Sequence, residues 1–424
     1  MARTARPPAR GVRRHGGRAL TVRRDAGARD RLGGAPGNEN RGIRAPGPGG
    51  RLRHAPRGAA DLSTPQGRRS QDRGAVGRDR VRRDDLLASG RDPRGAPGAT
   101  PVNLRILGRT GLAVSEIGFG GWAVGGNQYG NSYGPTDDAE SFRAIRTAFH
   151  HGCNFFDTAD VYGHGHSEEL IGAALSGVRP EVILATKVGG NFYNRDVHPL
   201  LKDRLAQLAG TPLEQIPPDA PLPVSHDVNF TPGYVRFAVQ QSLQRLRTDY
   251  IDLLQLHNPP MNLISTMETY GVLEDLKREG LIRFYGVSVH PPEEGIAAVH
   301  ATMPDTVQIV YNLARREAED QFLPAARAAG IGVIAREPLA NGFLAGTYRP
   351  DSVWEKGDIR ARMPRQYVQQ VAALGQRVRE LADKAGTTAA RLALKFVLDN
   401  QAVSTVIVGM KNVRQVEENL ALET

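Results

Sequence analysis

From residue 104 onward, short apolar runs alternate with longer segments in which apolar residues recur every three or four positions. The short runs predict strands at about residues 116–119, 154–158, 181–187, 250–256, 284–288, 306–311, 331–335 and 404–408. The longer segments predict helices at about residues 139–151, 167–175, 232–247, 265–279, 292–301, 318–329, 367–385 and 412–421. This alternation predicts a parallel sheet with helical crossovers.

Eight strand–helix units over roughly 320 residues suit a single α/β domain, the (β/α)8 TIM barrel, whose active site forms at the carboxyl ends of its strands. Upstream of the first strand, the segment RILGRTGLAVS predicts a β-hairpin that turns at Arg109, Thr110 and Gly111. Residues 189–231 and 341–366 follow strands without a predicted element. We expect both segments to wall a substrate pocket or cover a cofactor, although a tolerated surface insertion is an equal alternative for residues 189–231.

The first hundred residues differ from the rest in composition. They contain 24 Arg, no Lys, nine acidic residues and no Phe, Tyr or Trp, for a net charge of +15. The remainder holds 31 basic and 36 acidic residues, a net charge of −5. Because the basic segment offers too little apolar surface to offset the entropy of ordering, we predict a disordered Arg/Gly/Pro-rich extension at 1–100 and a barrel at 101–424.

Three interpretations of this extension stay open. An arginine-rich arm would bind RNA, but interspersed acids and missing aromatics argue against it, so a nucleic-acid partner is not expected. A dispensable tail and translated upstream sequence from a miscalled start are the other two, and Arg without Lys favours the last. A transit peptide is disfavoured because such peptides are Ser-rich and poor in acids.

Location follows from other features. The sequence has no run of 18 apolar residues and no secretory apolar segment, so a membrane span is not expected. Its single cysteine, Cys153, fits a reducing compartment and a buried small hydrophobe. We therefore expect a cytoplasmic protein.

Four polar residues lie where predicted strands end. Asp157 ends one apolar run, and Tyr162 follows five residues later. Lys187 closes the next run and His257 the one after it. If the four side chains share a pocket, Lys187 and Asp157 would lower the pKa of the tyrosine, and His257 would orient a carbonyl oxygen. The constellation predicts proton transfer to a carbonyl group.

At these positions the sequence resembles the aldo-keto reductase family, NAD(P)H-dependent oxidoreductases built on a (β/α)8 barrel. The resemblance covers residues from about Leu104 to Leu422. It is carried, in the family's order, by LGRTGLAVSEIGFGGW, FDTADVYGHGHSEELIG, LATKVGG, SLQRLRTDYIDLLQLHNP, YGVSVH, VQIVYNL, IAREPLANGFLAG and VGMKNVRQVEENL. The resemblance implies that Asp157, Tyr162, Lys187 and His257 form the catalytic tetrad and that the hairpin plugs the bottom of the barrel.

The resemblance also implies where a dinucleotide binds. Ser288 and Gln308 would hold the nicotinamide carboxamide, although Val289 stands where the family often has Asn. Arg336, where many members have Tyr, would stack on the ring or contact the pyrophosphate. The remaining candidates for cofactor binding are Trp122, the loop residues Pro338, Leu339, Gly342 and Leu344, and, at the end of the chain, Gly409, Lys411, Gln415, Glu418 and Asn419.

The function expected from this resemblance is reduction of a small aldehyde or ketone, with Tyr162 as the proton donor. NADPH is expected, because Lys411 and Arg414 flank the start of the last helix, where a 2′-phosphate would need cations; NADH is the alternative. Oxidation of a sugar or alcohol with NAD, and a non-catalytic regulatory subunit that binds NADP(H), are the rival functions. No metal site is expected. The natural substrate, which would depend on Trp122, Tyr129 and Tyr133, and the oligomeric state, including a homo-oligomer, stay open.

Overall fold

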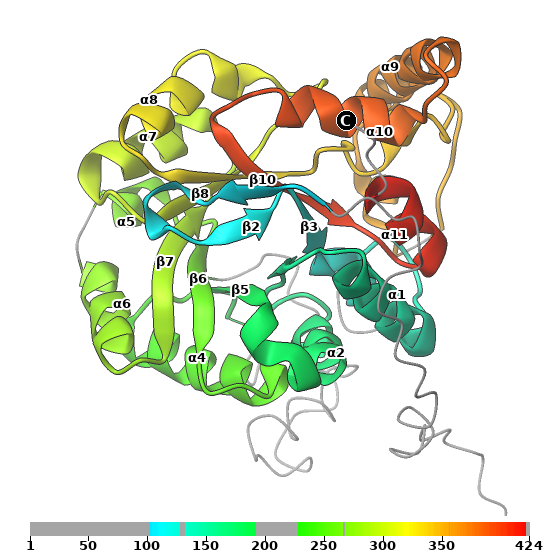
Figure 1. Ribbon diagram of the computed structural model, residues 1–424. Helices are drawn as coiled ribbons and strands as arrows, with labels where there is room; N and C mark the ends of the chain where they lie inside the picture. Colours follow the sequence, from blue (N-terminus) through cyan, green and yellow to red (C-terminus); the bar gives the residue numbers. More distant parts are fainter. Residues whose placement is uncertain (1–101, 128–131, 192–227, 266–267, 356, 421–424) are drawn as a thin grey trace, which may run out of the picture. The chain divides into compact units, whose positions relative to one another are not determined.

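The computed structural model describes residues 102–127, 132–191, 228–265, 268–355 and 357–420. The predicted extension at 1–100 lies outside them. Eight parallel strands form a closed barrel in the order β10-β3-β4-β5-β6-β7-β8-β9, with helices around it (Figure 1). The strands are β3 (Ile117–Gly120), β4 (Phe155–Asp157), β5 (Ile183–Val188), β6 (Ile251–His257), β7 (Ile282–Ser288), β8 (Thr306–Val310), β9 (Gly332–Arg336) and β10 (Val403–Gly409). The predicted (β/α)8 barrel is confirmed, and each predicted strand is present within two residues at either end.

The helices follow the predicted crossovers with three differences. They are α1 (Asp138–His150), α2 (His166–Leu175), α4 (Pro232–Leu246), α5 (Met261–Ile264), α6 (Glu268–Arg278), α7 (Pro292–Ala301), α8 (Phe322–Ala328), α9 (Arg365–Lys384), α10 (Ala389–Leu398) and α11 (Val413–Leu420). The helix predicted at 265–279 is preceded by the separate helix α5. The helix predicted at 318–329 is wrong in its first half, which is a 3-10 turn at Glu317–Glu319. Helix α10 was not predicted.

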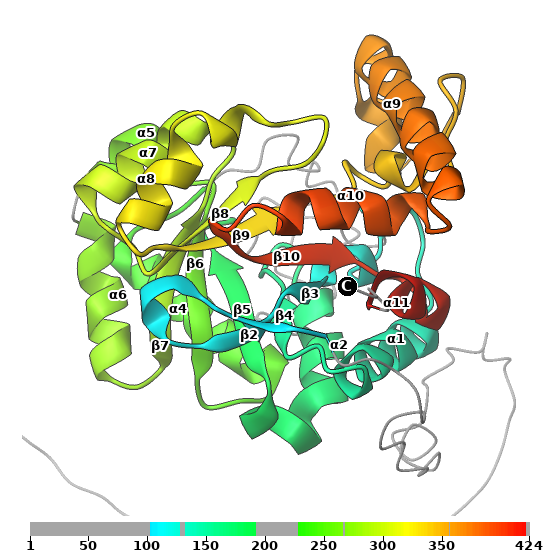
Figure 2. The same cartoon turned by 45° about the horizontal axis from the view of Figure 1, so that its top comes forward.

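The predicted hairpin is confirmed, and it closes the amino end of the barrel (Figure 2). Strands β1 (Leu104–Ile106) and β2 (Ala113–Ser115) pair antiparallel, and Gly111 adopts a left-handed conformation between them. Leu107 and Val114 are buried in one cluster with interior residues of the barrel: Phe155, Ile183, Ala185, Leu253, Ile334 and Ile407. The lower half of the barrel is therefore a packed core.

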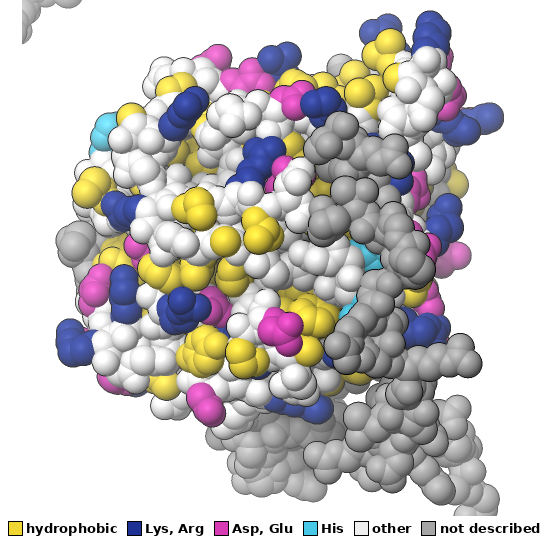
Figure 3. All heavy atoms as spheres, in the orientation of Figure 1, with side chains coloured by type: hydrophobic (Ala, Val, Ile, Leu, Met, Phe, Trp, Pro, Cys, Tyr) yellow, Lys and Arg dark blue, Asp and Glu magenta, His cyan; other side chains and the backbone are white. Residues whose placement is uncertain are grey.

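The outer face of the hairpin carries two exposed apolar side chains, Leu104 and Ile106, which are 57% and 59% exposed. On the side of the molecule drawn in Figure 3, apolar side chains are interspersed with charged ones.

Among the described residues, none of the helices is both long and apolar enough to cross a bilayer.

A second apolar cluster lies outside the barrel. Two short 3-10 turns, Phe343–Ala345 and Ile359–Arg362, interrupt the segment between β9 and α9, which the sequence had left without elements. Phe343 and Leu344 pack against Val368, Val371 and other residues of α9 and α10. This packing supports the loop that follows β9 at the carboxyl end of the barrel.

Candidate active site

Alternation along the strands brings the candidate residues together. In a strand, residues two apart point to the same face. Phe155, Ala185 and Leu253 belong to the cluster inside the barrel. Two residues beyond each of them come Asp157, Lys187 and Gln255, in the same order, so the interior changes from apolar to polar toward the carboxyl end. The same face ends in His257 on β6, Ser288 on β7, Gln308 on β8 and Arg336 on β9.

Asp157 and Lys187 form a buried ion pair. The Nζ atom of Lys187 donates to Oδ1 of Asp157 at 2.5 Å and to the backbone carbonyl of Thr158 at 2.8 Å. The Lys187 side chain is 0% exposed and that of Asp157 is 1% exposed. A buried charge of this kind is tolerated because its partner neutralises it and hydrogen bonds satisfy it.

Tyr162 lies against this pair. It belongs to the loop between β4 and α2, where Gly163 and Gly165 have positive φ angles of 59° and 89°. A Cβ atom on Gly163 would lie 2.2 Å from the carbonyl oxygen of Gly125, so only glycine allows this approach. The Tyr162 ring centroid lies 4.8 Å from Nζ of Lys187.

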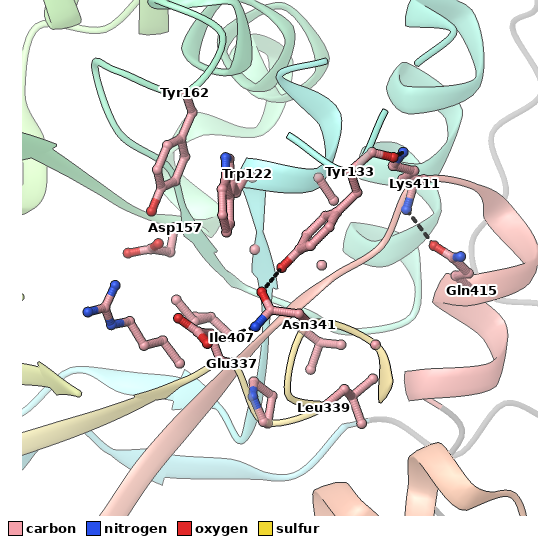
Figure 4. A pocket seen from close by; sticks show the side chains of 18 of the residues that line it. Trp122, Tyr133, Asp157, Tyr162, Glu337, Leu339, Asn341, Ile407, Lys411 and Gln415 are labelled. Carbon is pink, nitrogen blue, oxygen red and sulfur yellow. Dashed lines mark hydrogen bonds between the residues drawn. The ribbon is translucent and has the colours of Figure 1, made fainter. Parts of the chain in front are cut away.

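Two aromatic side chains fix the orientation of the Tyr162 ring. The ring of Trp122 stacks on it with the centroids 6.1 Å apart, and the ring of His257 meets it edge-on at 5.8 Å. Tyr162 extends toward Asp157 with Trp122 alongside (Figure 4). The structure therefore brings the four candidate catalytic residues together.

The electrostatics of Tyr162 correct one expectation. Burial raises the pKa of Tyr162 above its usual value, while Lys187 lowers it, Asp157 raises it and Arg336 lowers it; the net direction is upward. The sequence predicts a lowered pKa, because it does not show how far the half-buried ring is withdrawn from water. Asp157 acts instead on Lys187: burial lowers the pKa of that ammonium, but Asp157 and Tyr162 raise it more. At neutral pH Tyr162 is thus a protonated phenol beside a charged ammonium.

Two buried amides hold the other oxygen of Asp157. Oδ2 accepts hydrogen bonds from Nε2 of Gln308 at 2.9 Å and from Nε2 of Gln255 at 3.0 Å. Ser288 donates to Oε1 of Gln308 at 3.3 Å. Gln255 was not among the predicted site residues, although its position two residues before His257 put it on the same face of β6.

A cavity of about 250 Å³ opens beside Tyr162 and Asp157. Nine of the candidate cofactor residues line it: Trp122, Gln308, Arg336, Pro338, Leu339, Gly342, Gly409, Lys411 and Gln415. The other four do not line it. Ser288 lies beneath Gln308, Leu344 is buried in the cluster with α9, and Glu418 and Asn419 lie on α11.

Arg336 uses one guanidinium nitrogen for contacts within the protein, whereas another has no partner among the described residues. Its terminal nitrogen donates to the carbonyl of Val289 at 2.9 Å and contacts Nδ1 of His290 at 2.9 Å. Its Nε atom is buried and makes no hydrogen bond to any described residue. A buried donor without a partner costs free energy, so a ligand oxygen in the adjoining cavity would satisfy it. This observation fits a cofactor with carbonyl or phosphate oxygens.

The loop after β9 meets the loop after β3 across the cavity. The hydroxyl of Tyr133 donates to Oδ1 of Asn341 at 2.8 Å, and Nδ2 of Asn341 donates to Glu337 at 3.1 Å (Figure 4). Glu337 and Asn341 have positive φ angles of 54° and 59°. Strained conformations of this kind occur where a loop is held for ligand binding. The sequence did not single out Glu337 or Asn341.

The two cations expected at the 2′-phosphate differ in position. Lys411 lines the cavity and donates from Nζ to the backbone carbonyl of Tyr133, and burial lowers its pKa. Arg414 is exposed and does not line the cavity. Of the long segment at 189–231, residues 192–227 lie outside the described residues, as does Tyr129.

The sequence is similar to known proteins of one family. The model of the aldo/keto reductase family matches residues 116–423. The L-galactose dehydrogenase of Arabidopsis thaliana is 30% identical over 334 residues, which cover 77% of this chain and 89% of that protein. A probable voltage-gated potassium channel subunit beta of the same organism is 30% identical over 336 residues, 75% of this chain and 90% of that protein.

A solved structure agrees with this match. The aldo-keto reductase AKR11C1 from Bacillus halodurans, in its holo form, superposes with a TM-score of 0.58 at 28% identity. The match covers 76% of this chain and 91% of that chain.

Proposed function

The chain belongs to the aldo/keto reductase family of oxidoreductases, and on that premise we propose that it reduces a small aldehyde or ketone to an alcohol with NADPH, using Tyr162 as the proton donor. The observation that carries this proposal is the buried Asp157–Lys187 pair beside the Tyr162 ring, at the edge of the cavity. Lys187 stabilises the negative charge that forms on the phenol when it gives up its proton, and Asp157 holds that ammonium in place.

Each member of the tetrad has one task in the proposed reaction. A bound reduced nicotinamide would supply the hydride to the carbonyl carbon. Tyr162 donates its proton to the carbonyl oxygen, and Lys187 stabilises the phenolate that is left. Asp157 keeps the ammonium in place, and His257, whose ring packs against Tyr162, orients the carbonyl oxygen.

The cavity supports a dinucleotide as the cofactor. Gln308, which bonds to Asp157, and Arg336 line the cavity, and Lys411 and Gln415 line it where β10 leads into α11. Lys411 is the cation that would select the 2′-phosphate of NADPH, because a cation at a helix amino end suits a phosphate. The exposed Arg414 would contribute less.

The test is a substrate panel run with NADPH and with NADH. We expect turnover of 4-nitrobenzaldehyde. The kcat/KM with NADPH should be at least several-fold higher than with NADH, because the 2′-phosphate gains about one charge-assisted hydrogen bond. Lys411→Ala should remove most of that preference, whereas the matched variant Arg414→Ala should keep it. Equal kcat/KM for both cofactors in the wild-type protein would contradict the choice of NADPH.

Sequence similarity to two relatives supports two other functions. Similarity to an L-galactose dehydrogenase supports oxidation of a sugar, with the same residues acting in reverse. Similarity to a probable potassium channel subunit beta supports a regulatory subunit that binds the cofactor. A sugar included in the panel with NAD and NADP addresses the first. Tight cofactor binding without turnover of any carbonyl or alcohol would favour the second.

A further inference from the structure

Gln255 occupies the centre of the polar layer that crosses the barrel interior. Its side chain is buried, and β6 aligns it beside Lys187 of β5. Its Nε2 atom donates to Oδ2 of Asp157 at 3.0 Å, and its Oε1 atom accepts from Nε2 of Gln308 at 3.2 Å. Both ends of the amide are thus engaged, and exchanging its oxygen and nitrogen would set the oxygen against a carboxylate.

Packing does not explain an amide at this position. The neighbouring residues of β6 are Leu253, Leu254 and Leu256, and all three are buried. A buried amide costs free energy unless it is hydrogen-bonded, and an apolar side chain of the same size would fill the space without that cost. The amide is therefore accounted for by its contact with Asp157.

We propose that Gln255 is a positioning residue, which holds the carboxylate of Asp157 so that its Oδ1 atom faces Lys187, and which thereby sets the strength of Tyr162 as an acid. The inference rests on the proposed function of Tyr162. Gln255 does not line the cavity, and its side chain bonds to Asp157 and to Gln308, which keeps its own bond to Asp157 at 2.9 Å. Of the two amide donors to Oδ2, Gln308 lines the cavity and Gln255 does not, so Gln255 can be changed without removing a candidate cofactor contact.

The sign of the effect follows from the groups around Tyr162. Those groups are Asp157 on β4, Lys187 on β5, His257 on β6, Arg336 on β9 and Tyr133 from the loop after β3. Without the Gln255 donor, the charge of Asp157 acts on Tyr162 with less compensation, and Lys187 is held less firmly. Both changes raise the pKa of Tyr162.

The experiment measures kcat against pH for alcohol oxidation with NADP, in which the Tyr162 phenolate accepts the hydroxyl proton and the cofactor takes the hydride. The rate rises with pH through the pKa of Tyr162. For Gln255→Met we expect this rise to move about one pH unit higher, the scale of one hydrogen bond to a charged group. At neutral pH, kcat should fall about tenfold while the dissociation constant of the cofactor, from protein fluorescence, stays within about twofold.

Leu253→Met is the matched control, because it changes an apolar residue on the same face of the same strand. It is expected to keep the wild-type pH profile. A Gln255→Met protein with the wild-type profile would overturn the inference, as would an equal shift in the control. Gln255→Leu replaces Gln255→Met if the latter does not fold.

A double-mutant cycle separates this inference from the proposed function. Urea unfolding of Gln255→Met, Asp157→Asn and the double variant tests the contact without any turnover. Non-additive midpoint shifts support the positioning role, and additive shifts overturn it. A wild-type protein that oxidises and reduces no compound of the panel would overturn the proposed function, and the cycle alone would then decide the inference.

Discussion

Tyr162 is contacted by side chains from three parts of the chain. Trp122 stacks on its ring, His257 meets it edge-on, and Lys187 lies beneath it. Burial raises the pKa of its hydroxyl, and the two nearby cations, Lys187 and Arg336, oppose that rise. The hydroxyl therefore stays protonated at neutral pH. When it gives up its proton, the ammonium of Lys187 lies close enough to stabilise the phenolate that forms.

Tyr162→Phe should abolish carbonyl reduction with little change in fold or cofactor affinity. Lys187 keeps its bonds to Asp157 and to the carbonyl of Thr158, so the buried charge stays paired. We expect turnover to fall about 10²–10⁴-fold, the usual contribution of a positioned acid. Tyr133→Phe is the control: it removes a hydroxyl from the same cavity but not the proton donor. Tyr162→Phe with more than about a tenth of wild-type turnover would contradict the assignment.

The raised pKa of Tyr162 predicts the pH dependence of reduction. The acid form is the active one, and it is lost only as pH rises through a pKa above 10.0. Initial rates of reduction should therefore be level from about pH 7 to 9 and decline at higher pH. A decline centred between about pH 6 and 8 would mean that a group with the pKa of a histidine, not Tyr162, supplies the proton.

At the residue scale, the sequence predicted that Asp157, Lys187 and His257 meet, but it predicted neither the role of Gln255 nor the direction of the pKa shift of Tyr162. Asp157, Lys187 and His257 each end an apolar run, so the alternation of a strand was sufficient to align them. Gln255 was overlooked because a single polar residue inside an apolar run has no motif of its own. The pKa of Tyr162 could not be predicted, because its burial depends on Trp122 and His257, which come from distant parts of the chain.

At the scale of elements, α9 and α10 together support the wall of the cavity. Both helices pack on the turn at Phe343–Ala345, which directly follows the cavity residues Asn341 and Gly342. Gly375 of α9 permits this contact, since a Cβ atom there would lie 2.1 Å from the carbonyl oxygen of Phe343.

Gly375→Ala should therefore lower stability by about 1–3 kcal/mol, because a methyl group forced into a packed contact displaces backbone. Cofactor affinity should weaken as well, since the displaced turn adjoins the cavity. Thermal unfolding and fluorescence titration measure the two effects. Gly271→Ala in α6 is the matched control: a Cβ atom there meets nothing within 4 Å, and the helix should gain about 0.5–1 kcal/mol. Equal behaviour of the two variants would refute the packing argument.

The sequence contained signals for the elements that were missed. Thr388 accepts a hydrogen bond from the backbone of Arg391 and caps α10, whose apolar residues recur with helical spacing. The prediction assigned one helix to each crossover, and α10 is the second helix between β9 and β10. Pro324 explains the shortened α8, because proline lacks the amide hydrogen that a longer helix would need at that point.

At the scale of the whole molecule, we propose that residues 101–424 fold and work without the basic extension. Val102 packs in the main core, and Asn103 and Arg105 bond to Glu116. A protein comprising residues 101–424 should match the full chain in kcat/KM and in Tm within about 2 °C, since about 1 kcal/mol shifts a large domain by 2–4 °C. A larger fall in Tm would refute this boundary. Salt-dependent RNA binding by the full chain alone would indicate a polyanion-binding arm.

The packed amino end of the barrel has a kinetic consequence. Leu107 and Val114 cover that end over a packed apolar interior, so, among the described residues, the polar layer around Asp157 opens to solvent at the opposite end, where the cavity lies. Two reactants that enter and leave through the same opening cannot bind and dissociate independently of each other. Whichever one sits deeper has to arrive first and depart last, so the shape of the barrel alone favours a fixed order of binding and release.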